Sequence, residues 1–419
     1  MNTEKTRIGI YIHLPFCASK CAYCDFNSKA GMDKLIPQYQ QALMTHIREM
    51  EKVLSGFYID TVYFGGGTPS YYGSKRLTEL FSALKTHANV LVDSEVTFEA
   101  NPDSVEPVML QELKKAGFNR ISLGVQSAND KMLKTLGRRH TFAQAEKAVS
   151  LAREAGFENL SLDLMYGLPS QSKTDWAETL KKALSLKPEH MSCYALHLEE
   201  GTPLYSFKDT PFMPDDDAQA DMYLYAVEQL KQFGYKQYEI SNFCLPGYES
   251  RHNLRYWQCG QYIGFGAGAH SYFGSLRYSC ISDISQYIDA VSSGNAFIDM
   301  KEEITSFGKA SEYLMLGLRT THGISGEEYV STFKYSFDDI EHYLQKCRDH
   351  GWAAKSDGRW CFTPEGFLIS NTLICDILEL QQKELTKMNR FLHRDSSRFD
   401  EQLTMFPSAG QDITLFPGM

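Results

Sequence analysis

Residues 8 to about 200 alternate between short apolar stretches and longer amphipathic ones, and this alternation constrains the fold more than any other feature. Short apolar stretches are typical of buried strands, whereas apolar residues spaced by three and four are typical of helices. The expected strands are Ile8–His13, Ile59–Phe64, Glu95–Ala100, Arg120–Gly124, Asn159–Leu164 and Met191–Leu198. The expected helices are Ile36–Leu54, Ser74–Thr86, Ser104–Ala116, Phe142–Ala155 and Thr174–Leu186.

This order predicts repeated strand–helix–strand units and therefore an α/β fold with a parallel sheet. Gly117 and Gly156 follow two of the helical patterns, as glycine does at many helix ends. The sheet can curve into a full or partial barrel or stay flat. In either case the chemistry is expected at the carboxyl ends of the strands.

The remaining sequence suggests three further parts after a barrel core over residues 1–235. Residues 236–300, which are rich in glycine and aromatic side chains, look like a connector. Residues 301–385 look like a small α+β domain, because three helical patterns precede a hairpin in the order of a winged helix. The patterns are Lys309–Leu318, Glu327–Thr332 and Phe337–His350, followed by the hairpin Ala353–Thr363.

The small domain is acidic, which argues against DNA binding. Residues 300–380 hold 8 Lys and Arg against 13 Asp and Glu, a net charge of 8 − 13 = −5. We interpret this domain as a packing or lid module. The tail, residues 386–419, contains Gln402–Phe406, which resembles peptides that dock on bacterial sliding clamps; an unstructured tail is the favoured interpretation.

The overall charge and hydropathy exclude several classes of partner. The net charge is 42 − 52 = −10, so no global basic field recruits nucleic acid or anionic membrane. The longest uncharged stretch of note, Tyr256–Leu276, holds five glycines and is not a transmembrane segment. The N-terminus does not have the pattern of a signal peptide. We therefore expect a cytoplasmic protein, for which peripheral membrane contact stays open.

Three of the ten cysteines, Cys17, Cys21 and Cys24, fall within eight residues directly after the first expected strand. Thiolates on one short loop suit either zinc or an iron–sulfur cluster. Zinc would need a fourth ligand, for which His13 is a candidate. A [4Fe–4S] cluster held by three thiolates would keep one iron open for a substrate. Unligated cysteines are the third interpretation.

The spacing C-x3-C-x2-C on this loop resembles the radical S-adenosylmethionine (SAM) superfamily. Longer motifs over residues 8–380 resemble the oxygen-independent coproporphyrinogen III oxidase group within it. These motifs are Tyr-Ile-His-Leu-Pro-Phe-Cys17, Phe-Gly-Gly-Gly-Thr-Pro69, Glu-Ala-Asn-Pro102, Gly-Val-Gln-Ser127 and Asp-Leu-Met-Tyr-Gly-Leu-Pro169.

The resemblance implies a partial (β/α) barrel in which Cys17, Cys21 and Cys24 bind a [4Fe–4S] cluster and SAM chelates the open iron. It also implies a set of SAM-contacting residues. They are Tyr11, Tyr23, Gly66, Gly67, Thr68, Glu99, Gln126, Arg138 and Asp163.

For several of these residues, the residue type and its position in the predicted fold suggest a role independently of the resemblance. Glycines at 66 and 67 let the backbone approach a ligand and are expected to expose N–H donors. Glu99 and Gln126 end expected strands, where they can hydrogen-bond a ribose or an amine. Asp163 is expected to point to the barrel mouth and, because burial of a lone carboxylate is costly, to have a partner.

Two departures from the oxidase pattern resemble the HemW branch of heme chaperones. Phe26 stands where the oxidases carry a further cysteine, and residues 251–257 contain a His-Asn-x-x-Tyr-Trp segment. This branch implies heme contact by His252, Tyr256 and Trp257, with His270 as a second candidate ligand. The alternative is that His252 bonds locally and the two aromatic residues are core.

The leading hypothesis is a radical-SAM-type heme chaperone that binds heme, a [4Fe–4S] cluster and SAM. It would pass heme to an acceptor protein and take electrons from a donor such as flavodoxin or ferredoxin. A second hypothesis is an oxygen-independent coproporphyrinogen III dehydrogenase that decarboxylates propionates, which Phe26 weakens. A third is a zinc-binding adaptor without catalysis.

Overall fold

The computed structural model describes residues 5–396, with side chains to residue 387. The tail motif at residues 402–406 lies outside the described range. The chain divides into two compact units, one of residues 1–293 with 297–304 and the other of residues 294–296 with 305–419.

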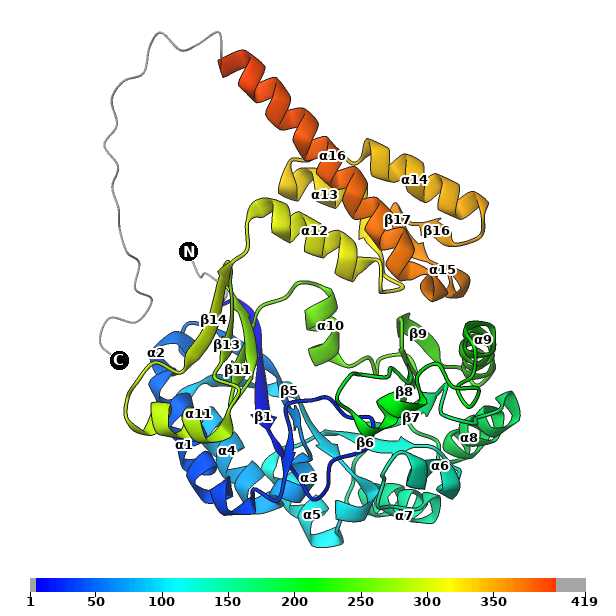
Figure 1. Ribbon diagram of the computed structural model, residues 1–419. Coiled ribbons are helices and arrows are strands. Elements are labelled where there is room, and N and C mark those ends of the chain that lie inside the picture. Colours follow the sequence, from blue (N-terminus) through cyan, green and yellow to red (C-terminus); the bar gives the residue numbers. More distant parts are fainter. Residues whose placement is uncertain (1–4, 397–419) are drawn as a thin grey trace. The chain divides into compact units, whose positions relative to one another are not determined.

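The first unit is built on parallel strands joined by helices, as the alternating sequence predicts (Figure 1). Each neighbouring pair from β1 through β8 runs parallel. The strands are β1 (Arg7–Leu14), β4 (Tyr58–Gly66), β5 (Asn89–Ala100), β6 (Arg120–Gln126), β7 (Leu160–Tyr166) and β8 (His190–Ala195). The connecting helices are α1 (Ile36–Glu49), α4 (Ser74–His87), α5 (Pro107–Ala116), α7 (Phe142–Glu154) and α8 (Lys173–Ser185).

Further elements, most of them short, complete the connections. They are β2 (Phe16–Cys17), β3 (Lys29–Ala30), α2 (Glu51–Leu54), α3 (Pro69–Tyr72), α6 (Asp130–Thr135) and α9 (Asp216–Gln232), with 3-10 turns at Asp33–Leu35, Pro102–Ser104 and Pro203–Phe207.

Local sequence explains where several helices begin and end. Thr141 and Ser172 form capping boxes at the starts of α7 and α8. Gly117 ends α5 with φ 111°, a left-handed conformation that glycine adopts without steric cost. In Figure 1 the helices lie on the outer side of the sheet.

Residues 236–300, expected as a connector, extend the sheet of the first unit instead. The twelve strands run in the order β14-β13-β12-β11-β1-β4-β5-β6-β7-β8-β10-β9, so the barrel is partial and not closed. The added elements are β9 (Lys236–Glu239), β10 (Asn242–Cys244), α10 (Arg251–Trp257), β11 (Tyr262–Phe265), β12 (His270–Phe273), β13 (Leu276–Cys280), α11 (Ile284–Ser292) and β14 (Ile298–Glu303).

The second unit has the helix, helix, strand, strand order that the sequence predicts, around buried Leu314, Leu344 and Trp360. Its small sheet runs β15-β17-β16. The elements are α12 (Ser306–Gly317), β15 (Ile324–Ser325), α13 (Gly326–Phe333), α14 (Asp338–Asp349), β16 (Ala353–Ser356), β17 (Arg359–Phe362), α15 (Pro364–Leu368) and α16 (Ser370–Ser396).

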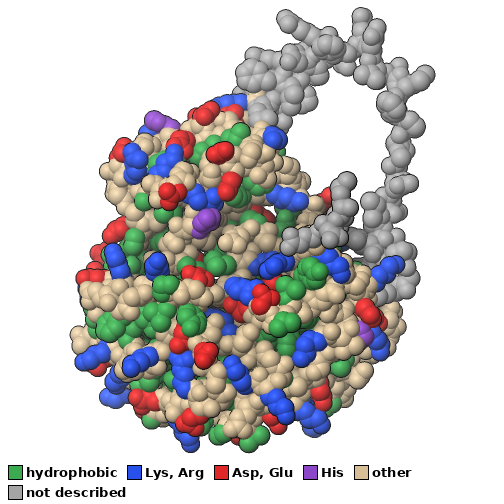
Figure 2. All heavy atoms as spheres, turned by 180° about the vertical axis from the view of Figure 1, so that it is seen from behind, with side chains coloured by type: hydrophobic (Ala, Val, Ile, Leu, Met, Phe, Trp, Pro, Cys, Tyr) green, Lys and Arg blue, Asp and Glu red, His purple; other side chains and the backbone are tan. Residues whose placement is uncertain are grey.

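The surface carries charges of both signs. On the face seen in Figure 2, Lys and Arg side chains are interspersed with Asp and Glu. In the described range, no helix is long and apolar enough to cross a membrane.

Candidate functional site

The predicted cluster and SAM residues converge on one cavity at the carboxyl ends of the parallel strands. It encloses about 1430 Å³ of empty space, part of it open to solvent. All three clustered cysteines line it, and so do all the predicted SAM residues except Tyr11. The lining residues from the two sets are Cys17, Cys21, Cys24, Tyr23, Gly66, Gly67, Thr68, Glu99, Gln126, Arg138 and Asp163.

The cysteine loop presents free, partly exposed thiols, each near a polar hydrogen. Thr68 donates to the Cys17 sulfur over 3.5 Å, and Arg138 donates to the Cys21 sulfur over 3.5 Å. Cys24 and Ser28 lie 4.0 Å apart, Sγ to Oγ. Burial raises the pKa of the Cys17 thiol, and hydrogen bonding by Thr68 and Ser28 opposes this rise.

The chemistry of this loop fits a cluster held by three thiolates. The fit rests on the type of ligand, three free thiols on one loop that lines the cavity, and not on their present spacing. Within residues 5–387, no group of three or more His, Cys, Asp and Glu side chains is already arranged around a single metal position. His13 is unsuited to be a fourth ligand, because its Nδ1 bonds the Tyr11 hydroxyl (3.0 Å) and its Nε2 bonds the Asn27 carbonyl (2.8 Å). Burial lowers the pKa of His13 to about 4.

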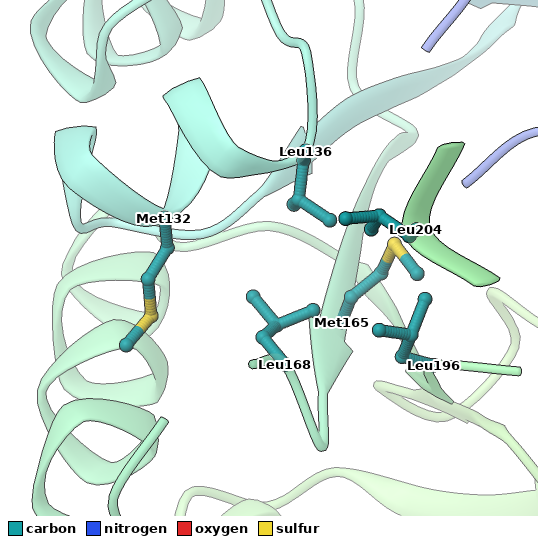
Figure 3. Packing of buried hydrophobic residues seen from close by; sticks show 6 residues of the cluster. All are labelled: Met132, Leu136, Met165, Leu168, Leu196 and Leu204. Carbon is teal, nitrogen blue, oxygen red and sulfur yellow. The ribbon is translucent and has the colours of Figure 1, made fainter. Parts of the chain in front are cut away.

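An apolar cluster, drawn in Figure 3, packs against the cysteine loop. Ala22 and Tyr23 of the loop pack against it, and the Ala22 amide donates to the Leu136 carbonyl over 3.0 Å. The loop is therefore held by packing as well as by hydrogen bonds. The cluster consists of Met132, Leu136, Met165, Leu168, Leu196 and Leu204.

The glycines at the end of β4 serve close packing, and the expectation of exposed N–H donors is wrong. A Cβ on Gly66, whose φ is 112°, would lie 2.4 Å from the His13 ring, and one on Gly67 would lie 2.6 Å from a backbone oxygen. The Gly66 amide donates to Glu99 (3.1 Å) and the Gly67 amide to Leu14 (2.9 Å). The segment thus holds the cysteine loop against the sheet.

Two half-buried carboxyl groups face the cavity with hydroxyl partners. Glu99 accepts from the Tyr63 hydroxyl over 2.9 Å, and burial raises its pKa to about 7. Asp163 accepts from Ser122 (3.0 Å) and Ser161 (3.3 Å), and burial raises its pKa too. The partner expected for Asp163 is therefore a set of hydroxyls.

Gln126 and Arg138 are fixed at the rim by the backbone. Gln126 has a φ of 63°, uncommon for a residue other than glycine and typical of functional sites. Arg138 donates to Asn101 and to the Gly124 carbonyl, both over 2.6 Å. Its guanidinium therefore links β6 to the Cys21 thiol.

The predicted heme residues lie outside this cavity. His252 on α10 is 1% exposed, and both ring nitrogens are bonded, Nδ1 to Thr61 (2.9 Å) and Nε2 to the Tyr256 hydroxyl (2.7 Å). Burial lowers the pKa of His252 to about 3. Trp257 is partly exposed and His270 is exposed, and neither lines the cavity.

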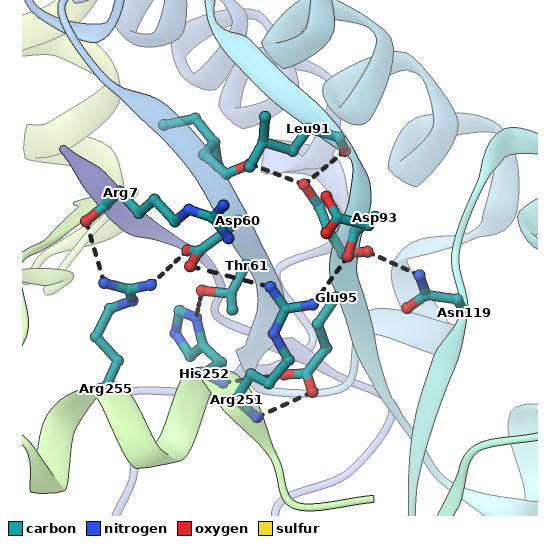
Figure 4. Close-up of polar contacts among 12 residues, drawn as sticks. Arg7, Asp60, Thr61, Leu91, Asp93, Glu95, Asn119, Arg251, His252 and Arg255 are labelled. Atoms are coloured by element: carbon teal, nitrogen blue, oxygen red, sulfur yellow. Dashed lines mark hydrogen bonds and ion pairs between the residues drawn. The ribbon is translucent and has the colours of Figure 1, made fainter. Parts of the chain in front are cut away.

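Helix α10 is anchored to the amino ends of the strands (Figure 4). The amides of Arg251 and His252 donate to Glu95 over 3.0 Å each. Arg255 pairs with Asp60. This arrangement gives His252 the local bonding that the sequence left as an alternative.

Sequence reasoning missed further cavity residues that alternate along the same strands. Side chains at i and i+2 of a strand share a face, so Gln126 on β6 implies Gly124, Ser122 and Arg120. Asp163 similarly pairs in register with Ser192, whose i+2 neighbour is Tyr194. The missed lining residues include Tyr63, Arg120, Ser122, Ser192, Tyr194, His197 and Asn253.

An open parallel barrel with three cysteines after its first strand defines a radical SAM protein. The model of the radical SAM superfamily matches residues 11–183, and that of the HemN C-terminal domain matches residues 308–369. The superfamily implies a [4Fe–4S] cluster and SAM as cofactors.

Relatives specify the family further. The heme chaperone HemW of Bacillus subtilis is 36% identical over 86% of this chain and 96% of its own length. The heme chaperone HemW of Escherichia coli is 33% identical over 88% and 97%. The chain therefore belongs to the HemW family.

A solved structure supports the fold. Coproporphyrinogen III oxidase (HemN) from Escherichia coli superposes with a TM-score of 0.79 over 89% of this chain and 90% of that one, at 22% identity. At this identity the likeness concerns the fold alone.

Proposed function

We propose that this protein is a heme chaperone that binds heme, a [4Fe–4S] cluster and SAM and transfers heme to an acceptor protein. The observation that carries the proposal is the 33–36% identity to heme chaperones over most of both chains. The proposal includes a cytoplasmic location and an electron donor such as flavodoxin or ferredoxin. Peripheral membrane contact is compatible with it.

Cys17, Cys21 and Cys24 would hold the cluster, whose open iron supplies the position for the amino and carboxylate groups of SAM. Thr68 and Arg138 donate to two of the sulfurs and so stabilise the thiolate forms. The other lining residues would orient SAM, with Glu99 and Gln126 as hydrogen-bonding groups. Tyr11 would act through His13, to which it is bonded, and not by contact.

His252 is the proposed heme ligand, with Tyr256, Trp257 and His270 nearby in the sequence. For its Nε2 to reach iron, the bond to the Tyr256 hydroxyl must open. The low pKa of His252 keeps the imidazole neutral, which is the form that ligates iron. Heme binding by His252 thus requires a rearrangement within α10.

Coproporphyrinogen dehydrogenation is the second candidate, because the fold resembles that of HemN. Phe26 argues against it: the side chain lines the cavity and is 68% exposed where the oxidases carry a cysteine.

Anaerobic reconstitution followed by parallel titration with heme and coproporphyrinogen tests the proposal. We expect stoichiometric heme retention and no protoporphyrinogen. A preparation with an intact cluster that retained no heme would refute the chaperone function, and steady turnover of coproporphyrinogen would establish the second candidate.

A further inference from the structure

Arg120, at the start of β6, places a buried guanidinium against the cavity. The residue is 1% exposed and lines the cavity. Its Nε–H is buried without a hydrogen-bond partner. Among the residues that the structure describes, the guanidinium forms no hydrogen bond and no ion pair. A buried charge in this situation is costly and rare in folded proteins.

The three carboxylates that act on Arg120 are each bonded to other donors. Burial lowers the pKa of Arg120, but the negative field of Glu95, with other groups, outweighs this and raises it, so the side chain stays charged. The bonded pairs are Glu95 with the amides of Arg251 and His252, Glu99 with Tyr63 and Gly66, and Asp163 with Ser122 and Ser161.

The planar fork of an arginine suits a carboxylate, which it can bind through two parallel hydrogen bonds. The carboxylate of SAM is one source of such a group. A propionate of heme is the other source. Arg120 lines the same cavity as the proposed SAM residues Glu99 and Asp163, so the titrations below must distinguish the two.

Resting on the proposed function, we propose that Arg120 binds a propionate carboxylate of heme within this cavity, which Asn253 of α10, next to the proposed ligand His252, also lines. Heme carries two propionates on one edge, and the rest of the macrocycle is largely apolar. Tyr63 offers aromatic surface beside Arg120, because both residues pair in register with Thr97. Met165 and Tyr194, the latter 39% exposed, line the same cavity further along the strands.

Glu99 and Asp163 repel a propionate at Arg120 less than two fully ionised carboxylates would. Burial raises the pKa of Glu99 to about 7 and shifts that of Asp163 in the same direction. Both groups therefore take up a proton more readily when a further anion approaches. The guanidinium then remains the dominant charge for a propionate.

Heme and heme dimethyl ester, whose propionates are blocked, separate this role from a structural one. Both are titrated into the reconstituted wild type, Arg120→Gln, Arg120→Lys and the control Arg153→Gln, whose side chain lies outside the cavity. The heme absorption band reports the affinity. We expect wild type to bind heme at least about tenfold more tightly than the ester, Arg120→Gln to lose this preference, and Arg153→Gln to retain it.

Three outcomes would overturn the inference. Equal binding of heme and ester by wild type would exclude a propionate contact and leave the chaperone function intact. Equal weakening of both ligands in Arg120→Gln would show a structural role. Loss of SAM affinity in Arg120→Gln with full heme affinity would assign Arg120 to SAM. Binding of neither ligand by wild type would instead refute the proposed function itself.

Discussion

The two ends of the inner face of the partial barrel both carry ligand-type side chains, but their pairing differs. At the cavity end, the cysteine thiols are partly exposed, and their polar neighbours lie 3.5 to 4.0 Å from the sulfurs. At the α10 end, His252 has both ring nitrogens bonded, and Asp60 pairs with Arg255. Partly exposed and weakly bonded ligand groups therefore distinguish a prepared binding site from a polar region that fastens a helix, in which even the unpartnered Arg255 Nε–H is buried. The following experiments test that distinction.

The largest effect is expected from the cysteine loop. Cys17→Ala should remove nearly all iron and acid-labile sulfide from anaerobically reconstituted protein, because no other thiol of the loop can replace the ligand. Metal analysis and the cluster absorbance measure this. Cys375→Ala, at an exposed cysteine of the second unit, should keep its iron. Normal iron content in Cys17→Ala would refute the ligand assignment.

The next largest effect is expected from the ion pair between Asp60 and Arg255, which anchors α10 to the sheet. Asp60→Ala should lower the free energy of unfolding by ~3 kcal/mol, because it leaves Arg255 largely buried without its partner. Denaturant unfolding measures the change. Asp221→Ala breaks the exposed pair with Lys173 and should cost less than ~1 kcal/mol. If the two variants lost the same free energy of unfolding, the Asp60–Arg255 pair would contribute no more to stability than an exposed ion pair.

The pH dependence of stability should report on two acids, the half-buried Glu99 and the buried Glu239. Burial raises the pKa of Glu99 and of Glu239 to about 7, above the ordinary 4.5. Between these values the folded state holds protons that the unfolded state releases, so this stabilisation, complete below pH 4.5, is lost as pH rises through 7. The free energy of unfolding, measured from acid to neutral pH, should therefore fall less with rising pH in Glu99→Gln and in Glu239→Gln than in the wild type.

Only the cavity residue should also affect the ligand. Glu99→Gln is expected to weaken SAM binding several-fold by isothermal titration, whereas Glu239→Gln, which is not in the cavity lining, should leave it unchanged. Equal SAM affinities in the two variants would remove Glu99 from the SAM site.

The smallest effect tests whether His252 must be freed to bind heme. Tyr256→Phe removes the hydroxyl bonded to Nε2, and a net hydrogen bond is worth ~1 kcal/mol, so heme should bind about fivefold more tightly. His252→Ala should bind heme more weakly while its cluster persists. Unchanged heme affinity in both variants would leave His252 with a purely structural role.

Sequence periodicity predicted the parallel strands and their helices because both buried faces and caps are encoded locally. It did not predict β11 to β14, since glycines at 264, 266 and 268 interrupt the strand pattern and the pairing is set by distant partners. The cluster residues were found from motif spacing. Arg120 was missed, because its missing partner is visible only once the strands are placed side by side.

The sheet with two free edges, β14 and β9, has a further consequence. A closed barrel of eight strands leaves room only for its own side chains or one small molecule. An open sheet does not enclose its ligand on all sides. A wide, rigid and flat ligand such as heme can therefore enter and leave through the opening between the two edge strands without separating any strands. A heme carrier must release its ligand as readily as it binds it. For such a protein, the open sheet matters more than high affinity.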